Sequence, residues 1–366
     1  MKTIVEIISF TFGLYSLILI LLGTPANLLC FYVFKRLIPN RSNATIIVFS
    51  YLALVELLIP FTWNLNFATR ELIYKRQRVI TIKNLEQNSL FTCKFISYSA
   101  YFLLQCAAWL KTLATFARCV SLHHDWSIRK YFMKSTIIHR LSWLTIILFG
   151  LINLPILIIN GKRITRIDPQ TNQTRIEILC YQSKFFQFWE ILHLLLYNFI
   201  PFTLMILCNI SIIQHVHQSR RRTQRSKIRS QTSLKPSSTT LTASRRFLST
   251  NGSRLSKTLI FISVFFILLT SPSAIFYISL GKIIKRHRNI ITMSLTNLAT
   301  TCHVVSFIIY WVTSTDFQIA VYNFLCCRPI VSQRQQTQIT TEEKRLSTLS
   351  TLPISRSYEK QKHTRE

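Results

Sequence analysis

Two residues of opposite charge interrupt long apolar stretches of the sequence. Glu56 lies within the apolar run 44–67, and Lys111 lies within the run 95–122. At a helical rise of about 1.5 Å per residue, each would lie roughly 17 Å from the same end of its helix. A single ionised side chain at that depth of a bilayer is costly, so we expect Glu56 and Lys111 to form an ion pair. The alternative is a neutral Glu56 that is hydrogen-bonded within the core.

The elements that would position this pair are seven apolar runs. The chain has 366 residues, of which 49% are hydrophobic, and its net charge of +31 falls mostly between the runs. A helix of about 20 apolar residues crosses a bilayer, and backbone amides in lipid require such internal hydrogen bonding. We therefore predict an all-α membrane protein, a seven-transmembrane-helix bundle. The expected spans are about 7–34, 44–67, 95–122, 141–160, 185–215, 258–280 and 290–315.

The distribution of Lys and Arg sets the orientation of these spans. Most of the basic residues lie in the connections after the first, third and fifth spans and in the C-terminal tail. Because cytoplasmic loops carry an excess of Lys and Arg, we expect these segments inside the cell and the N-terminus outside, in the plasma membrane. The opposite loops are also basic. They would attract an acidic ligand or an anionic matrix, or they merely solvate the surface.

The nine cysteines divide between the two sides of this topology. Cys93 and Cys180 face the oxidising exterior, where a disulfide persists. We expect them to pair, which would tie the outer end of the third helix to the second outer loop, and two free thiols are the alternative. The other cysteines lie in or beside spans or on the inner side, at Cys30, Cys106, Cys119, Cys208, Cys302, Cys326 and Cys327.

The segments outside the spans carry modification signals. Phe317, Ala320, Val321, Phe324 and Leu325 recur at helical spacing within 316–327, which predicts an amphipathic eighth helix on the inner leaflet. Cys326 and Cys327 at its end are candidates for palmitoylation. The membrane-embedded part would thus be 1–327, followed by a disordered tail, 328–366, whose serines and threonines could be phosphorylated or merely solvated. Asn172 heads an Asn-Gln-Thr glycosylation acceptor on the outer side.

These features together resemble the rhodopsin-like class of G-protein-coupled receptors over roughly residues 7–327. The motifs that carry the resemblance appear in the class's order, and they are Gly23–Asn27, Leu52–Glu56, Cys93 ahead of Arg118, Trp143, Pro201, Pro272, and Ser306–Tyr310 followed by Phe317. The resemblance implies a receptor rather than an enzyme, with no cofactor, metal or nucleic acid. A G protein would bind beside Arg118 and Tyr310, with Ser306 and Pro272 taking part in activation. Arrestin and a receptor kinase would bind the phosphorylated tail.

Several departures from the class pattern bear on mechanism. Ala117-Arg118-Cys119 lacks the acid that pairs with the arginine in the class, so we expect raised basal coupling unless carbonyls and water hold Arg118. Thr270 stands where the class usually has a tryptophan. In the class the acid of the second span helps to hold a sodium ion. Ala107 and Ser306 replace typical co-ligands here, so we expect Lys111 to take the place of the cation.

The ligand is constrained by residue type. Ala100 cannot pair with an amine where the class has an aspartate, and Thr300 cannot form the Schiff base of an opsin. Ser306–Tyr310 resembles the Asn-Phe-x-x-Tyr variant of invertebrate neuropeptide receptors, including FMRFamide-type ones, which implies an extracellular peptide ligand. Glu190 could receive a cationic peptide side chain. The candidate cavity residues, each of which could instead be a packing residue, are Tyr101, Gln105, Glu190, His193 and Tyr277.

Two rival functions use the same apolar runs. A seven-helix chemosensory receptor or channel would have the inverted topology, and glycosylation at Asn40 or Asn43 instead of Asn172 would indicate it. A secondary transporter would need more buried charge than Glu56 and Lys111 provide. The chain also has no internal repeat.

Overall fold

The computed structural model describes residues 2–37, 44–75, 84–122, 126–167, 174–181, 184–231, 240–276 and 288–326. The helices are α1 (Lys2–Leu37), α2 (Ala44–Leu58), α3 (Trp63–Thr69), α4 (Leu90–Leu122), α5 (Trp126–Phe132), α6 (Ser135–Ile159), α7 (Lys184–Leu194), α8 (Ile200–Gln231), α9 (Thr240–Ile275), α10 (Arg288–Val304), α11 (Ser306–Thr313) and α12 (Thr315–Leu325). The strands are β1 (Lys162–Ile167) and β2 (Thr174–Leu179). Residues Met1–Val321 form one compact unit and Tyr322–Glu366 a second, so α12 runs across their boundary.

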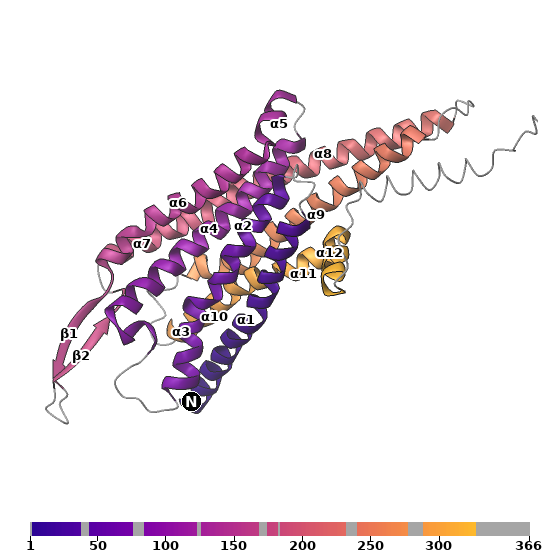
Figure 1. Cartoon of the computed structure of the whole chain (residues 1–366). Helices are drawn as coiled ribbons and strands as arrows, with labels where there is room; N and C mark the ends of the chain where they lie inside the picture. The colour runs from indigo at the N-terminus through magenta and orange to yellow at the C-terminus, as the bar shows by residue number, and fades with distance from the viewer. Residues whose placement is uncertain are drawn as a thin grey trace, which may run out of the picture. The chain divides into compact units, whose positions relative to one another are not determined.

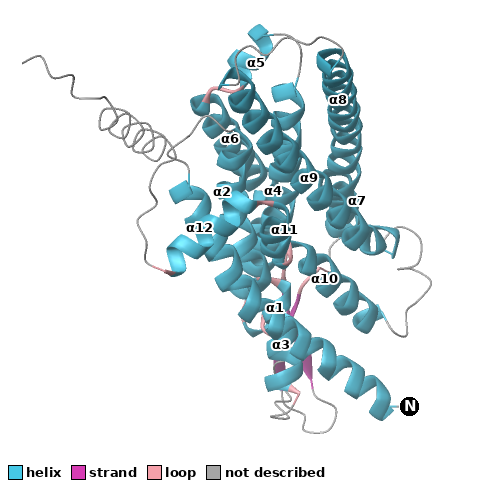
Figure 2. Cartoon of the chain, turned by 90° about the vertical axis from the view of Figure 1, so that its right-hand side faces the viewer, coloured by secondary structure: helices cyan, strands magenta, loops and turns pink. Residues whose placement is uncertain are grey.

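The helices of the first unit run side by side as a bundle (Figure 1). The β1–β2 hairpin lies at one end of the bundle together with the N-terminus, and α5 lies at the other end. Helix α4 is central, because it contacts α2, α6, α8 and α9. Figure 2 shows the same arrangement from the side, with α4 in the middle of the bundle.

Six helices in the described part of the chain are long and apolar enough to cross a membrane. They are Ile4–Lys35, Ala44–Tyr74, Ser135–Ile159, Phe188–Gln218, Ser256–Ile275 and Arg288–Thr313. The sequence predicts a seventh at 95–122, and that segment is helical as α4, but it is not among the six. Its buried face explains the difference, since it carries polar residues such as Ser97, Gln105 and Lys111.

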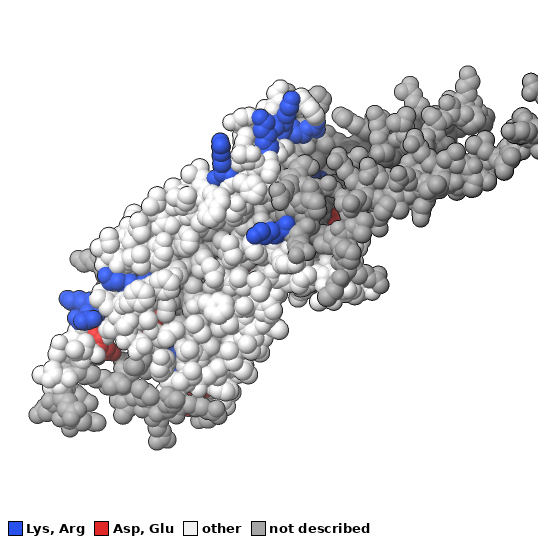
Figure 3. Space-filling view, viewed as in Figure 1, with Lys and Arg blue, Asp and Glu red and all other residues white. Residues whose placement is uncertain are grey.

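The outward surface of the bundle is apolar. Leu21 of α1 is 62% exposed and Ile158 of α6 is 76% exposed, and many other large apolar side chains on these helices are also exposed. In Figure 3 the Lys and Arg side chains gather toward the hairpin end and toward α5, with an uncharged surface between them on the face shown. A contiguous apolar belt of this kind marks a surface that contacts lipid or another protein.

Two prolines coincide with departures from regular α-helix. Pro60 lacks the N–H that an α-helix requires, and α2 gives way at Leu58 to a 3-10 turn, Ile59–Phe61, before α3 begins. The expected span 44–67 is therefore not one continuous α-helix. Ahead of Pro201, Leu195–Phe199 forms a π-helical turn that buries Tyr197 and Asn198.

The hairpin is fastened to the bundle beside Gly161. Strands β1 and β2 are antiparallel, with Lys162 opposite Leu179. A disulfide joins Cys93 at the start of α4 to Cys180 after β2, as the sequence led us to expect. Gly161 has a backbone φ of +83°, and a Cβ there would lie 2.8 Å from Leu90 Cδ1 and 3.1 Å from Cys93 Sγ. Only glycine fits this close approach without displacing its neighbours.

Candidate functional site

An ion pair lies buried at the centre of the bundle. The Lys111 Nζ atom of α4 lies 2.7 Å from Glu56 Oε1 of α2, and each side chain is 1% exposed. This is the pair that the charge placement predicts. Mutual pairing compensates two charges that would each be costly alone away from water.

His303 of α10 completes a buried cluster that we call the ion cluster: Glu56, Lys111, His303 and Ser306. His303 Nδ1 lies 3.0 Å from both Glu56 Oε1 and Lys111 Nζ. The Ser306 hydroxyl donates to Glu56 Oε1 at 3.3 Å. The Lys111 ammonium also lies 4.8 Å from the centre of the Phe266 ring, a cation–π contact.

Sequence reasoning missed His303. The available signal was its position, because His303 precedes Ser306 by one helical turn within an apolar run, and residues three apart share a face. Glu56 Oε2 has no hydrogen-bond partner among the described residues. The carboxylate thus concentrates its contacts on one oxygen.

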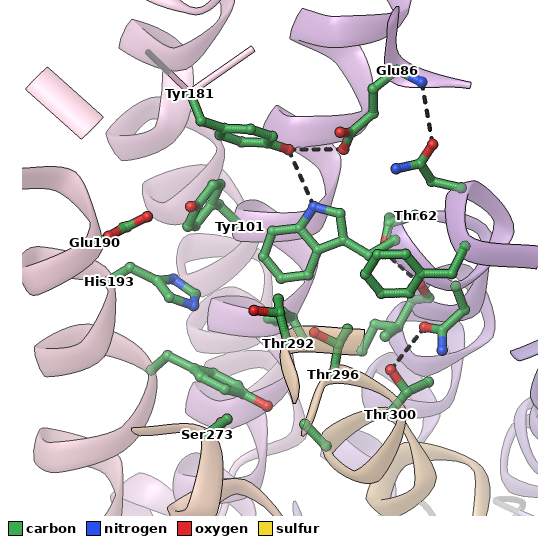
Figure 4. Close-up of a pocket in the computed structure, with 18 of the residues that line it drawn as sticks. Thr62, Glu86, Tyr101, Tyr181, Glu190, His193, Ser273, Thr292, Thr296 and Thr300 are labelled. Atoms are coloured by element: carbon green, nitrogen blue, oxygen red, sulfur yellow. Dashed lines mark hydrogen bonds between the residues drawn. The ribbon is translucent and has the colours of Figure 1, made fainter. Parts of the chain in front are cut away.

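A cavity of about 280 Å³ extends from Tyr181, which follows β2, to Tyr197, whose hydroxyl lies near His303. Figure 4 shows part of the cavity lining. Of the residues expected to line a cavity, Tyr101, Glu190 and His193 do so. Gln105 lies behind the wall instead, where it contacts the His193 ring at 3.2 Å and accepts a 2.6 Å hydrogen bond from Asn153. Tyr277 falls outside the described residues. The other polar and aromatic lining residues include Trp63, Asn64, Arg70, Glu86, Tyr181, Tyr197, Arg288 and Thr300.

Tyr197 connects the cavity to the ion cluster. Its ring stacks on His193, with ring centres 5.2 Å apart, and both residues line the cavity. The Tyr197 hydroxyl lies 3.5 Å from His303 Nε2, at the outer limit of a hydrogen bond. A group that moves Tyr197 would therefore act directly on the ion cluster.

Tyr181 forms the roof of the cavity. Its backbone has a left-handed φ of 63°, a conformation that costs free energy in a non-glycine residue. Three hydrogen bonds hold its hydroxyl, which accepts from Ser97 Oγ at 2.7 Å and Trp63 Nε1 at 3.2 Å and donates to Glu86 Oε1 at 2.8 Å. Figure 4 shows the contact between Tyr181 and Glu86 above the cavity. Cys180 is the preceding residue, so the disulfide holds the same point covalently.

Glu86 at this roof titrates in an unusual range. Burial raises the pKa of its carboxyl to about 7, against the lowering effects of the Tyr181 hydrogen bond and of the Arg70 charge. Burial and the neighbouring Glu86 also raise the pKa of Tyr181 well above its ordinary value, so the phenol stays protonated and can donate. Neither residue was singled out from the sequence as a binding residue, because their contacts join distant segments.

Arg118 lies toward the opposite end of α4. Its Nε donates to Ser256 Oγ of α9 at 3.1 Å, and its Nη1 donates to Ser121 Oγ at 3.3 Å. Two serine hydroxyl groups thus bind the guanidinium, a kind of partner that was not expected from the sequence. Next to this contact, the Thr258 and Thr313 hydroxyls join α9 to α11 at 2.8 Å.

The remaining residues named from the sequence motifs lie as follows in the structure. Pro272 lies inside α9. Tyr310 is buried among Phe34, Phe49 and Phe317, and its hydroxyl has no hydrogen-bond partner among the described residues. Phe317, Ala320 and Val321 of α12 are buried, whereas Phe324 and Leu325 are exposed. Cys326 is exposed, and Asn172 and Cys327 fall outside the described residues.

The described part of the chain therefore presents a cavity at one end, a buried ion cluster beneath it, and an arginine that bridges two helices at the other end. The sequence matches no protein-family model and no curated protein.

Proposed function

We propose that the protein is a G-protein-coupled receptor of the rhodopsin-like class, which crosses the plasma membrane seven times with its N-terminus outside. The motif order of the sequence supports this proposal, and so do the six membrane-length helices and the central α4, which would be the seventh crossing. The disulfide at the hairpin end supports the orientation, because such a bond persists in oxidising compartments. Helix α12 would lie on the inner leaflet.

The observation that carries the proposal is the line of contacts from the cavity to Arg118. Tyr197 joins the cavity to His303, and His303 joins Glu56 to Lys111 on α4. Helix α4 then carries Arg118, which is bound to Ser256 of α9. A ligand that prefers one arrangement of Tyr197 would shift the population of α4 and α9 arrangements at the other end.

In this mechanism an extracellular ligand, most simply a peptide, enters the cavity and stabilises an arrangement in which α9 separates from Arg118. The opened inner end then admits a G protein beside Arg118 and Tyr310. No bond is made or broken, so the protein binds and relays. Arrestin and a receptor kinase would act on the C-terminal tail.

A neuropeptide screen tests the proposal. Cells that express the chain with a G-protein reporter are exposed to a synthetic peptide library, and we expect at least one peptide to give a concentration-dependent signal. Arg118→Ala should abolish that signal while surface expression and peptide binding persist. Full signalling by Arg118→Ala, or epitope tags showing both chain ends on one face of the membrane, would contradict the proposal. A sugar at Asn40 or Asn43 would instead indicate an inverted chemosensory protein.

A further inference from the structure

Four charged residues line the cavity: Arg70, Glu86, Glu190 and Arg288. Some of these charged groups already have a hydrogen-bond or ion-pair partner, and a group without one is the more favourable site for a charged ligand. A buried charge that already has its partner gains little from a new one, whereas a partly desolvated carboxylate without a partner is favourable for a cation.

Two of the four charges are already engaged. Arg70 Nε donates to Glu71 Oε1 at 2.8 Å, and its Nη2 lies 3.2 Å from Met293 Sδ. Glu86 accepts the Tyr181 hydroxyl, and its backbone N–H donates to Asn66 Oδ1 at 3.3 Å. Both residues therefore serve the walls and roof of the cavity.

Glu190 differs from both. It lies on α7 beside His193, and Figure 4 shows its carboxylate on the wall formed with Tyr101. No hydrogen bond or ion pair joins it to any residue that the structure describes, and Arg288 acts on it only at longer range. Glu190 is half-buried, whereas Arg288 is exposed at the start of α10. A cation at Glu190 would thus be partly shielded from water, and an anion at Arg288 would be largely screened.

The aromatic lining favours the same charge. Trp63, Tyr101 and Tyr197 contribute rings to the cavity. The face of an aromatic ring carries negative potential and attracts ammonium and guanidinium groups, most strongly where water is excluded. The indole N–H of Trp63 is already donated to Tyr181.

From these observations we infer that the cavity selects its ligand through a cationic group, an alkylammonium or a guanidinium, which Glu190 receives against the aromatic wall. The inference rests on the proposed function only in taking this cavity as the ligand site. The group of the ligand that enters the cavity would be positively charged, although the surrounding outer loops are basic. Those loops would instead repel a cationic ligand until it reaches Glu190.

Charged thiol reagents test the inference without a known ligand. Thr292 lines the cavity, and the purified Thr292→Cys protein is treated with trimethylammonioethyl methanethiosulfonate or with its anionic sulfonatoethyl counterpart. Labelling of residue 292 is followed by peptide mass spectrometry, which separates it from the native cysteines. The ratio of the two rates cancels changes in thiolate fraction. We expect this ratio to exceed that of the denatured protein by about tenfold.

A matched pair of second-site variants identifies the residue responsible. Glu190→Gln should return the ratio close to that of the denatured chain. Glu86→Gln, which also removes a lining carboxylate, should leave most of the preference in place. A preference for the anionic reagent, no preference, or a preference that survives Glu190→Gln would overturn the inference.

Ser273→Cys, at a second lining position, repeats the measurement in case Thr292→Cys fails to fold. If neither position reacts with either reagent, the cavity is closed to ions of this size and the inference is equally overturned. No G protein takes part in the labelling. A cation preference without G-protein signalling would therefore support the inference and contradict the proposed receptor function. Signalling without the preference would support the receptor function and contradict the inference.

Discussion

The Lys111 ammonium lies 2.7 Å from Glu56 Oε1, and His303 Nδ1 lies 3.0 Å from both atoms. One carboxylate oxygen of Glu56 thus contacts both the Lys111 ammonium and the His303 ring. The pair links α2 to α4, and His303 adds α10, so three helices meet at one buried charge cluster. Breaking this cluster from either side leaves an unpaired charge in the core.

The ion pair predicts a reciprocal mutational pattern. Glu56→Gln and Lys111→Met should each lower the stability of detergent-solubilised protein by about 3–5 kcal/mol, because each leaves the partner charge buried and uncompensated. The double variant should recover most of the loss. Thermal unfolding measures all three, and Ser306→Ala, which removes one long hydrogen bond, should have a much smaller effect. If Lys111→Met keeps expression and signalling while Glu56→Gln loses them, the two residues do not act as a pair.

Tyr197→Phe tests the connection between the cavity and the ion cluster. The variant keeps the ring that stacks on His193 and removes the hydroxyl near His303. We expect ligand binding to persist and the maximal response in a G-protein reporter assay to fall by about two- to tenfold, the range that one hydrogen bond supports. Tyr15→Phe is the control, since it removes a hydroxyl that contacts Thr301 away from the cavity lining. Equal losses in both variants would argue against a specific connection.

Ser256→Ala should raise ligand-independent signalling. The hydroxyl accepts from Arg118 and joins α9 to α4. Without it, the resting arrangement loses a hydrogen bond to a charged group, which is enough to shift a two-state equilibrium by about tenfold. Basal reporter activity at matched surface expression is the measurement. Ser263→Ala on the same helix serves as control, because that hydroxyl donates within its own helix to Leu259. Unchanged basal activity in Ser256→Ala would show that this hydroxyl does not restrain Arg118.

Glu86 predicts a stability that depends on pH. Its pKa in the folded protein is about 7, above the ordinary value of 4.5, so the folded state binds the proton more tightly than the unfolded state does. Stability from this group is therefore full below about pH 4.5 and is lost as the pH rises toward 7. The difference in melting temperature between the wild type and Glu86→Gln, measured from pH 5 to pH 8 (about the range in which the group titrates), should increase with pH in favour of the variant. A constant difference would show that Glu86 does not titrate there.

Some parts of the site could be predicted because the chemistry of a residue in its expected environment leaves it few possible partners. Glu56 and Lys111 interrupt apolar runs at equal depth, and a bilayer penalises each charge alone, so their pairing follows from position. Cys93 and Cys180 follow from the chemistry of thiols on the two sides of a membrane. Tyr101, Glu190 and His193 were expected to line a cavity, and they line the one described above.

Other parts depend on contacts between distant segments. Tyr181 and Glu86 meet where the disulfide and the Tyr181 hydrogen bonds join the end of β2 to the start of α4. Gln105 faces Asn153 and His193 rather than the cavity, a choice between two sides of one helix that periodicity does not settle. The break at Pro60 likewise changes which residues of 44–67 face inward. Helix α4 is less apolar than the six helices of membrane length, because a central helix is surrounded by protein rather than lipid and can carry polar residues.

Gly161, between α6 and β1, packs against Leu90 and the Cys93 sulfur of α4, and its backbone φ of +83° is strained for any other residue. In a comprehensive mutational scan this position should therefore score as intolerant as a binding residue, although it lies outside the cavity lining. Sensitivity to substitution near the hairpin end of this bundle will report how the hairpin is attached as much as what the protein recognises.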